Sequence, residues 1–136
     1  MVARGIRNNN PLNIRKGNNW QGERHPQADA QFEEFQSMVM GLRAGIKLVR
    51  NYIDGRTSWG RPCQSIDALV TRWAPPSENN TQAYIKAVSD ATGIHPLQRI
   101  YSNNRDMVCR IVQAMAKQES GTLIDMQLIR SAWDLL

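Results

Sequence analysis

From Ser37 onward, apolar residues recur at the three- and four-residue spacing of an α-helix, and this periodicity restricts the chain to a mainly helical fold. In the first such segment the apolar residues share one face, and Gly55 supplies a stop signal. These apolar residues are Leu42, Ile46, Val49 and Ile53. We therefore expect a helix over Met38–Asp54.

Further segments begin with a polar cap and carry an apolar stripe of the same period. The expected caps are Ser65, Asn80 or Thr81, Asn103 or Asn104, and Asp125. The stripes that follow three of them contain Ile66, Leu69, Val70 and Trp73; Tyr84, Ile85 and Val88; and Met126, Ile129 and Trp133. The expected helix ends are the Pro75–Pro76 pair, Gly93 and Gly121.

The first thirty-five residues are instead rich in Asn, Gly, Arg and Gln, which favour turns. Turn signals fill Lys16–Asn19 and Gly22–Ala30, and the flanking segments Asn13–Arg15 and Gln31–Phe35 have the length of short strands. We predict a mainly α (α+β) fold, in which one helical domain over residues 1–136 carries one small β-hairpin near its N-terminus.

A length of 136 residues with 41% hydrophobic residues fits a single compact domain. Because the start of the sequence lacks an apolar segment and no apolar run reaches membrane-spanning length, we expect neither a signal peptide nor a transmembrane segment. Cys63 and Cys109 are too few for a disulfide framework, and their spacing leaves open whether they pair. His25 and His95 stand alone, so we expect no metal site, and no organic cofactor is implied.

The formal net charge of +5 favours a polyanionic partner such as nucleic acid, anionic lipid or bacterial cell wall. The basic residues are scattered, without the run or the interleaved aromatics of a nucleic-acid-binding segment. We therefore rank nucleic acid last and read most of these residues as solvated surface.

A single carboxylate is the strongest candidate for a catalytic group. Glu119 follows Ile111, Val112 and Met115 by eight, seven and four residues, so it extends a core-facing helical stripe into the last turn before Gly121. Partial burial and the negative end of the helix dipole should favour its protonated form, which suits a general acid. The alternative from spacing alone is an exposed helix-end residue at the edge of the core.

Polar and aromatic residues elsewhere are candidates for sugar binding. Asn10 and Asn13 lie in an Asn-rich segment that either lines a cleft or bonds to its own backbone in turns. Trp20 and Trp73 either stack on sugar rings or belong to the core. The Pro-bounded turn after Trp73 presents further polar groups to solvent. These groups are Glu78, Asn80 and Tyr84. For Glu78 the alternative is that its carboxylate only stabilises a helix N-terminus.

Several motifs along the chain resemble a phage-associated family of small lysozyme-like domains, often described only as phage structural proteins. The motifs are Gly5–Arg15, Trp20–Gly22, Phe32–Phe35, Gly41–Ala44 and Trp73–Thr81. The similarity covers nearly the whole chain, and the second motif brings Gln21 into the set of candidate substrate-binding residues. The resemblance implies a lysozyme-like fold acting on peptidoglycan.

Gln118–Gly121 also resembles the catalytic-helix motif of lytic transglycosylases and goose-type lysozymes. In those enzymes the Glu motif comes first, a substrate-binding segment follows, and a third segment comes late in the chain. Here Asn10–Ile14 would be the substrate-binding segment and Thr81–Val88 the third one, and the Glu motif comes last, as in a circular permutant. The resemblance implies a muramidase that cleaves the bond between N-acetylmuramic acid (MurNAc) and N-acetylglucosamine (GlcNAc), with Glu119 as its acid.

The sequence does not identify a second carboxylate, which a hydrolase needs and a transglycosylase does not. Asp29 is the first choice, because it precedes the second strand of the expected hairpin and resembles an acidic position of the phage family. Glu78 is the next choice. Three other acids are equally well explained as solvated hairpin residues. They are Glu23, Glu33 and Glu34.

We expect a monomer that acts on peptidoglycan glycan strands in the periplasm or on the cell wall. Without its own signal peptide it would be delivered by a phage particle, a holin or a secretion system, and it would then have a delivery or immunity protein as partner. The main alternative is a non-catalytic virion or wall-binding module that keeps the lysozyme-like fold. A basic nucleic-acid-binding domain is the third alternative.

Overall fold

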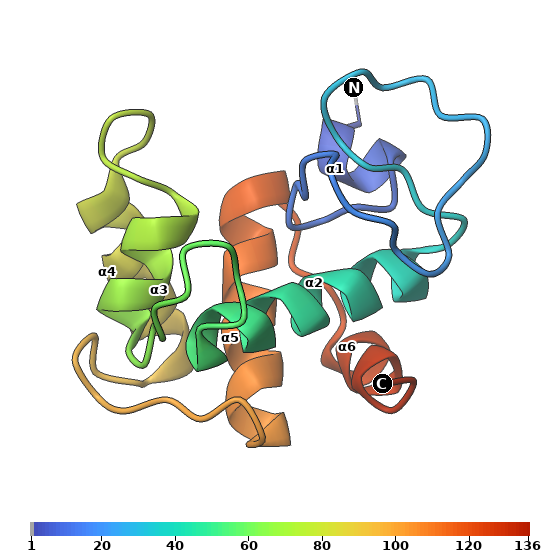
Figure 1. Ribbon diagram of the computed structural model, residues 1–136. Coiled ribbons are helices and arrows are strands. Elements are labelled where there is room, and N and C mark those ends of the chain that lie inside the picture. Colours follow the sequence, from blue (N-terminus) through green and yellow to red (C-terminus); the bar gives the residue numbers. More distant parts are fainter. Residues whose placement is uncertain (1) are drawn as a thin grey trace.

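The computed structural model describes residues 2–136, which fold into six helices around one core (Figure 1). The helices are α1 (Arg4–Arg7), α2 (Met38–Asp54), α3 (Ile66–Trp73), α4 (Thr81–Thr92), α5 (Arg105–Ser120) and α6 (Met126–Trp133). The expected mainly α fold is confirmed. The short helix α1 was not predicted, since a single turn without a side-chain cap leaves no periodicity to detect.

Local hydrogen bonds explain why the long helices begin and end where they do. Four of them start at a residue whose side chain accepts a hydrogen bond from the backbone N–H three residues later. These caps are Ser37, Ser65, Asn80 and Asn104. Three helices end at a glycine in the left-handed conformation, at Gly55, Gly93 and Gly121. Helix boundaries in this chain therefore follow from local sequence.

The predicted N-terminal β-hairpin is wrong. The described segment makes only two isolated antiparallel bridges, Arg15 with Phe32 and Glu23 with Phe35. The fully buried Asn10 replaces part of the ladder, because its amide donates to the carbonyls of Ile14 and Glu33 and accepts from the Ile14 N–H. Side-chain bonds of this kind satisfy the backbone without strand pairing.

The three acids that were equally well explained as solvated are all buried, which corrects that interpretation. Glu23, Glu33 and Glu34 are 8%, 3% and 5% exposed. The Glu34 carboxylate accepts hydrogen bonds from the backbone N–H groups of Ala28 and Asp29. These bonds, above all the one from Asp29, lower the pKa of Glu34. Glu34 therefore organises the loop as an anion.

Glu33 lies in the opposite environment. Burial, and then the neighbouring Glu23 carboxyl, raises the pKa of Glu33 from 4.5 to about 7. Lys16 opposes this effect in part, and His25 lies 3.9 Å from the Glu23 carboxylate. The folded protein therefore holds a proton on Glu33 that the unfolded chain releases near pH 4.5, so stability falls as the pH rises from 4.5 to about 7.

Glu33→Gln should mimic the protonated carboxyl and raise the free energy of unfolding above pH 7 by roughly 1–2 kcal/mol, with little effect below pH 4.5. Urea unfolding at both pH values measures the difference. Glu34→Gln is the matched control and should destabilise the protein above pH 7, because it removes an anion that accepts several hydrogen bonds. Equal effects of the two variants would contradict this assignment.

Helix α5 runs through the middle of the molecule, with α3 and α4 on one side and the N-terminal loops and α6 on the other, while α2 crosses it (Figure 1). The core on α5 includes Val108, Ile111 and Met115, each fully buried. Cys63 and Cys109 are buried free thiols. The C-terminal end of α5 therefore emerges between two walls of the molecule.

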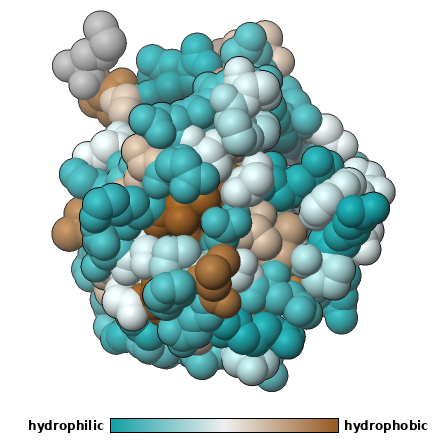
Figure 2. Space-filling model, turned by 90° about the vertical axis from the view of Figure 1, so that its left-hand side faces the viewer, coloured by the Kyte–Doolittle hydropathy of each residue, from teal (hydrophilic) through white to brown (hydrophobic). Residues whose placement is uncertain are grey.

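On the side where α3 and α4 lie, the surface is mainly hydrophilic, and its hydrophobic patches are small and separate (Figure 2). Within residues 2–136, none of the helices combines the length and the hydropathy that crossing a membrane requires. Nor do three or more potential metal-ligating His, Cys, Asp or Glu side chains cluster in that part of the chain.

Candidate active site

The Glu119 carboxyl group is held between two hydrogen-bond donors. The Tyr84 hydroxyl donates to Oε2 at 3.0 Å, and the Asn13 side-chain amide donates to Oε1 at 3.2 Å. Glu119 itself is half-buried in the last turn of α5. Three residues predicted from separate segments of the sequence therefore meet at one point.

Backbone geometry and burial position both donors. Asn13 has a φ of 53°, a left-handed conformation that Asn tolerates better than most residues, and its amide also bonds the Glu119 backbone carbonyl at 3.2 Å. Tyr84 belongs to the buried stripe of α4 and is 7% exposed. Burial, and then the adjacent Glu119 charge, raises the pKa of the Tyr84 hydroxyl, which therefore stays a donor.

A surface hollow opens beside this carboxyl group. Its walls come from the N-terminal loops, from the end of α3 with the loop that follows, and from the end of α5. The lining residues are Asn13, Arg15, Phe32, Trp73, Ala74, Glu78, Asn79 and Glu119. Because Glu119 lines the hollow, a bound molecule can reach its carboxyl group.

Two further hollows extend this one along α2. The second shares Asn13, Arg15 and Trp73 with the first and adds Ile14, Asn18, Leu48 and Tyr52. The third shares Asn18, Leu48 and Tyr52 with the second and reaches Asn19, Trp20, Lys47, Asn51, Arg56, Thr57 and Ser58. Together the three hollows form one groove with Glu119 at one end. An extended polar chain with several units fits such a surface better than a compact ligand does.

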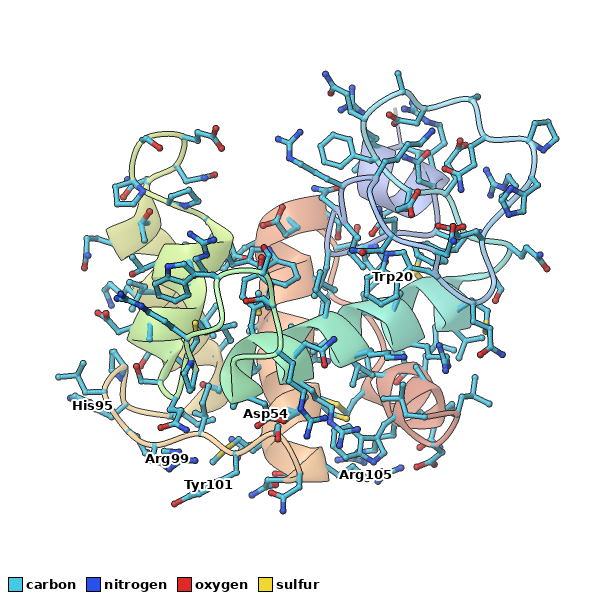
Figure 3. The ribbon with its side chains drawn as sticks, in the orientation of Figure 1. Trp20, Asp54, His95, Arg99, Tyr101 and Arg105 are labelled. Atoms are coloured by element: carbon cyan, nitrogen blue, oxygen red, sulfur yellow. The ribbon has the colours of Figure 1, made fainter. Side chains whose placement is uncertain are left out.

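Two tryptophans predicted to bind substrate line this groove. The Trp73 ring packs at 57° against Tyr52, with 5.2 Å between ring centroids, and both side chains are partly exposed in the groove. Trp20 lies between α2 and the N-terminal loops (Figure 3), packed against Ile14 and Phe35. Trp73 is thus the better placed for stacking on a ring, whereas Trp20 mainly supports the groove wall.

The sequence comparison decides the family of this chain. It is 40% identical over 125 residues to Protein P5 of Pseudoalteromonas phage PM2, and the match covers 89% of this chain and 73% of Protein P5. The chain belongs to the Protein P5 family. It is therefore a phage-related protein, which confirms the phage association predicted from sequence. No protein-family model matches it, and the name of Protein P5 specifies no activity.

In this member of the Protein P5 family, Asp29 serves a turn rather than the groove. Its carboxylate accepts hydrogen bonds from the backbone N–H groups of Gln31 and Phe32 and from the Asn8 amide. These bonds, led by the one from Gln31, lower the pKa of Asp29 to about 2. Asp29 is not among the groove-lining residues, so the structure does not bring it together with Glu119.

The other predicted residues divide between groove and scaffold. Glu78 lines the first hollow from an exposed loop. The Asn10 side chain donates its hydrogen bonds to backbone carbonyls, which agrees with the alternative that this segment bonds to backbone in turns. Asn80 caps α4. Gln21 lies exposed in a turn. Asn10, Asn80 and Gln21 are outside the groove as defined by its lining.

Sequence reasoning missed Tyr52, Asn18 and Arg15 as groove residues. The Arg15 guanidinium lies 4.9 Å from the centre of the Phe32 ring, which holds it at the wall. Tyr52 directly precedes the buried Ile53, so periodicity places it beside the core stripe without indicating a groove. The sequence signal that could have indicated Tyr52 is an aromatic residue with a polar hydroxyl at the edge of an apolar helical stripe.

Proposed function

We propose that the chain is a peptidoglycan glycosidase that cleaves the β-1,4 bond between MurNAc and GlcNAc, with Glu119 as the general acid. The observation that carries this proposal is the Glu119 carboxyl at the end of a polar groove, fixed by the Tyr84 hydroxyl and the Asn13 amide. A positioned carboxyl beside a chain-shaped surface is what glycoside cleavage requires.

In this mechanism Glu119 donates a proton to the bridging oxygen as the bond from MurNAc C1 to that oxygen breaks, and GlcNAc leaves with a 4-hydroxyl. Negative charge then develops on the Glu119 carboxyl group. The Tyr84 O–H and the Asn13 N–H already point at its two oxygens, so this charge is stabilised without rearrangement.

The carboxyl groups near the site favour a lytic transglycosylase over a hydrolase. Asp29 is committed to its turn, and Glu78 projects from an exposed loop. A transglycosylase needs one carboxyl group, because the MurNAc 6-hydroxyl attacks C1 and its proton returns to Glu119. The products are a 1,6-anhydro-MurNAc end and a GlcNAc end, with Glu119 restored to its starting state.

The family relationship supports a phage context for this activity. We propose that a phage particle delivers the protein to the wall, where it acts on glycan strands. The net charge of +5 would help hold it on an anionic polymer, and this contribution should weaken with salt.

Mass spectrometry of the muropeptides that the wild-type protein releases from purified peptidoglycan tests the proposal. We expect 1,6-anhydro-MurNAc ends. Hydrated reducing ends would replace the transglycosylase by a hydrolase and direct attention to Glu78. If no fragments are released, the glycosidase proposal fails and the non-catalytic virion or wall-binding module becomes the better explanation.

Tyr84→Phe should slow muropeptide release by about 10- to 100-fold, because a hydrogen bond to a charged group contributes about 1.5–3 kcal/mol. The Phe ring keeps the buried packing of Tyr84 and removes only the donor to Glu119. Tyr101→Phe is the control, since Tyr101 is exposed and lies away from the groove (Figure 3). Unchanged activity of Tyr84→Phe would remove Tyr84 from the mechanism.

A further inference from the structure

The outer face of α2 carries a row of cations. Arg43, Lys47 and Arg50 follow one another at intervals of four and three residues, which places them on the same side of the helix, and Arg56 follows just beyond its end. All four line one surface hollow, here called the cationic hollow. This hollow is separate from the Glu119 hollow and has no role in the mechanism above.

The cationic hollow adjoins the groove. The cationic hollow shares three lining residues with the third hollow of the groove, namely Lys47, Asn51 and Arg56. The third hollow is the end of the groove opposite Glu119. A polymer that occupies the groove therefore passes beside the four cations.

These cations lack protein counterions. Within residues 2–136, no carboxylate lies within 4.0 Å of the charged end of Arg43, Lys47, Arg50 or Arg56. Asp54, the acidic side chain in the hollow, accepts hydrogen bonds of 2.7 and 2.8 Å from the Ser102 hydroxyl. The hollow is therefore a concentrated positive site on one side of the molecule.

One of the side chains is also held in place, since the Arg50 guanidinium lies 4.4 Å from the centre of the Trp133 ring. A second, Arg43, has a buried Nε without a hydrogen-bond partner among the described residues. By contrast, Lys86 and Arg105 on other helices are each paired with an aspartate. A held cation loses less conformational freedom when it binds an anion, which favours recognition over diffuse attraction.

We infer that the cationic hollow binds the carboxylates of the stem peptides that hang from the glycan strand in the groove. This inference rests on the proposed function, because the anions must belong to the polymer that the groove holds. In intact peptidoglycan the sugars are neutral, because the lactyl carboxyl of each MurNAc is joined to its stem peptide as an amide, and the stem peptides carry the free carboxylates. The groove would hold the sugars and the hollow would hold the peptide anions.

A binding measurement tests this inference. Co-sedimentation with purified sacculi, carried out on the full chain with Glu119→Gln to preserve the polymer, compares intact sacculi with sacculi whose stem-peptide carboxylates have been converted to amides with a carbodiimide and ammonia. The test variant adds Arg43→Gln and Arg50→Gln, which line the cationic hollow but not the groove, and thermal unfolding checks that it folds. The control variant adds Lys86→Gln and Arg99→Gln, which lie outside both the groove and the cationic hollow and lower the net charge equally.

We expect the test variant to bind intact sacculi about 10-fold more weakly than its parent and to bind the amidated sacculi as well as its parent does. The control variant should match the parent on both materials. Equal losses on intact and amidated sacculi, or an equal loss in the control variant, would overturn the inference.

A third arm separates carboxylates from wall phosphates. If the difference between parent and test variant persists after the carboxylates are amidated and disappears when phosphate polymers are extracted, the ligand is a phosphodiester and the carboxylate assignment is wrong. If the wild type releases no muropeptides and no variant binds glycan, the proposed function fails and this inference fails with it. If release occurs but the test variant binds normally, the inference alone fails.

Discussion

Glu119→Gln should reduce muropeptide release by about 10²- to 10⁴-fold, the range that general acid catalysis contributes. Gln has nearly the shape of Glu but no proton to donate. Its amide also fits the site, because the Tyr84 hydroxyl can accept from an N–H and the Asn13 side-chain oxygen has no partner in the described structure. The loss should therefore be chemical, with thermal unfolding and binding to sacculi close to wild type.

The matched control is Glu78→Gln, which makes the same change in the same hollow. We expect it to retain most of the activity, because attack by the substrate 6-hydroxyl needs no second carboxyl group. Release by the Glu119→Gln variant at the wild-type rate would remove Glu119 from the acid role. A comparable loss in both variants would mean a two-carboxylate hydrolase, and the muropeptides should then carry reducing ends.

Gly41→Ala should be the most destabilising small substitution in the chain. A Cβ at this position would lie 1.6 Å from the Asn9 carbonyl oxygen and 2.8 Å from the carbonyl carbon. Because both atoms are backbone, the loop must move. Overpacking costs about 1–3 kcal/mol and sometimes more, and a clash with backbone belongs at or above the upper end of that range. Ala recovers about 1 kcal/mol of helix propensity, so we expect a net loss of about 2 kcal/mol or more.

Gly45→Ala is the comparison, one turn further along α2. There the new Cβ would meet only the ends of the Leu12 side chain, at 3.3 Å, and these can shift. Its free energy of unfolding should stay within about 1 kcal/mol of wild type. Urea unfolding of both variants measures the difference. A similar stability for the two would show that the N-terminal loop does not depend on its close approach to α2.

The same contact links stability to the site. Asn9 lies four residues before Asn13, and its side-chain amide donates a hydrogen bond to the Phe35 backbone carbonyl. The Phe35 ring in turn lies 3.3 Å from the position that a Cβ on Gly41 would take. Displacing this loop should move the Asn13 amide away from Glu119. Gly41→Ala should therefore lose activity even at temperatures where it remains folded, whereas Gly45→Ala should not.

Much of the helical architecture was predictable because helix ends are local events. Gly55 ends α2 as expected, and the expected caps Ser65 and Asn80 begin α3 and α4. Position on a helical stripe also sufficed to select Glu119, since periodicity reports which side of a helix meets the core. Tyr84 was instead selected as a polar group presented by the Pro-bounded turn, whereas the structure buries it in the stripe of α4.

The N-terminal region was less predictable, because its organisation depends on contacts between residues distant in sequence. Turn residues and short apolar singles suggested a hairpin, but Asn10 satisfies the carbonyls of Ile14 and Glu33 in place of a ladder. Likewise, Glu33 and Glu34 were equally well explained from sequence as solvated residues, whereas the fold encloses both. Hydropathy describes a side chain alone and does not include the partners that make its burial favourable.

By itself, the sequence determined the helices, their ends, the family and the residue types available for catalysis. Only the tertiary structure decided which of those residues act together: it brings Asn13 and Tyr84 to Glu119 across separations of 106 and 35 residues, and it leaves Asp29 in a turn. The reason is physical, since helix periodicity and capping depend on neighbours a few positions apart, whereas a site depends on how packed elements cross and on which polar groups that packing leaves open to a ligand.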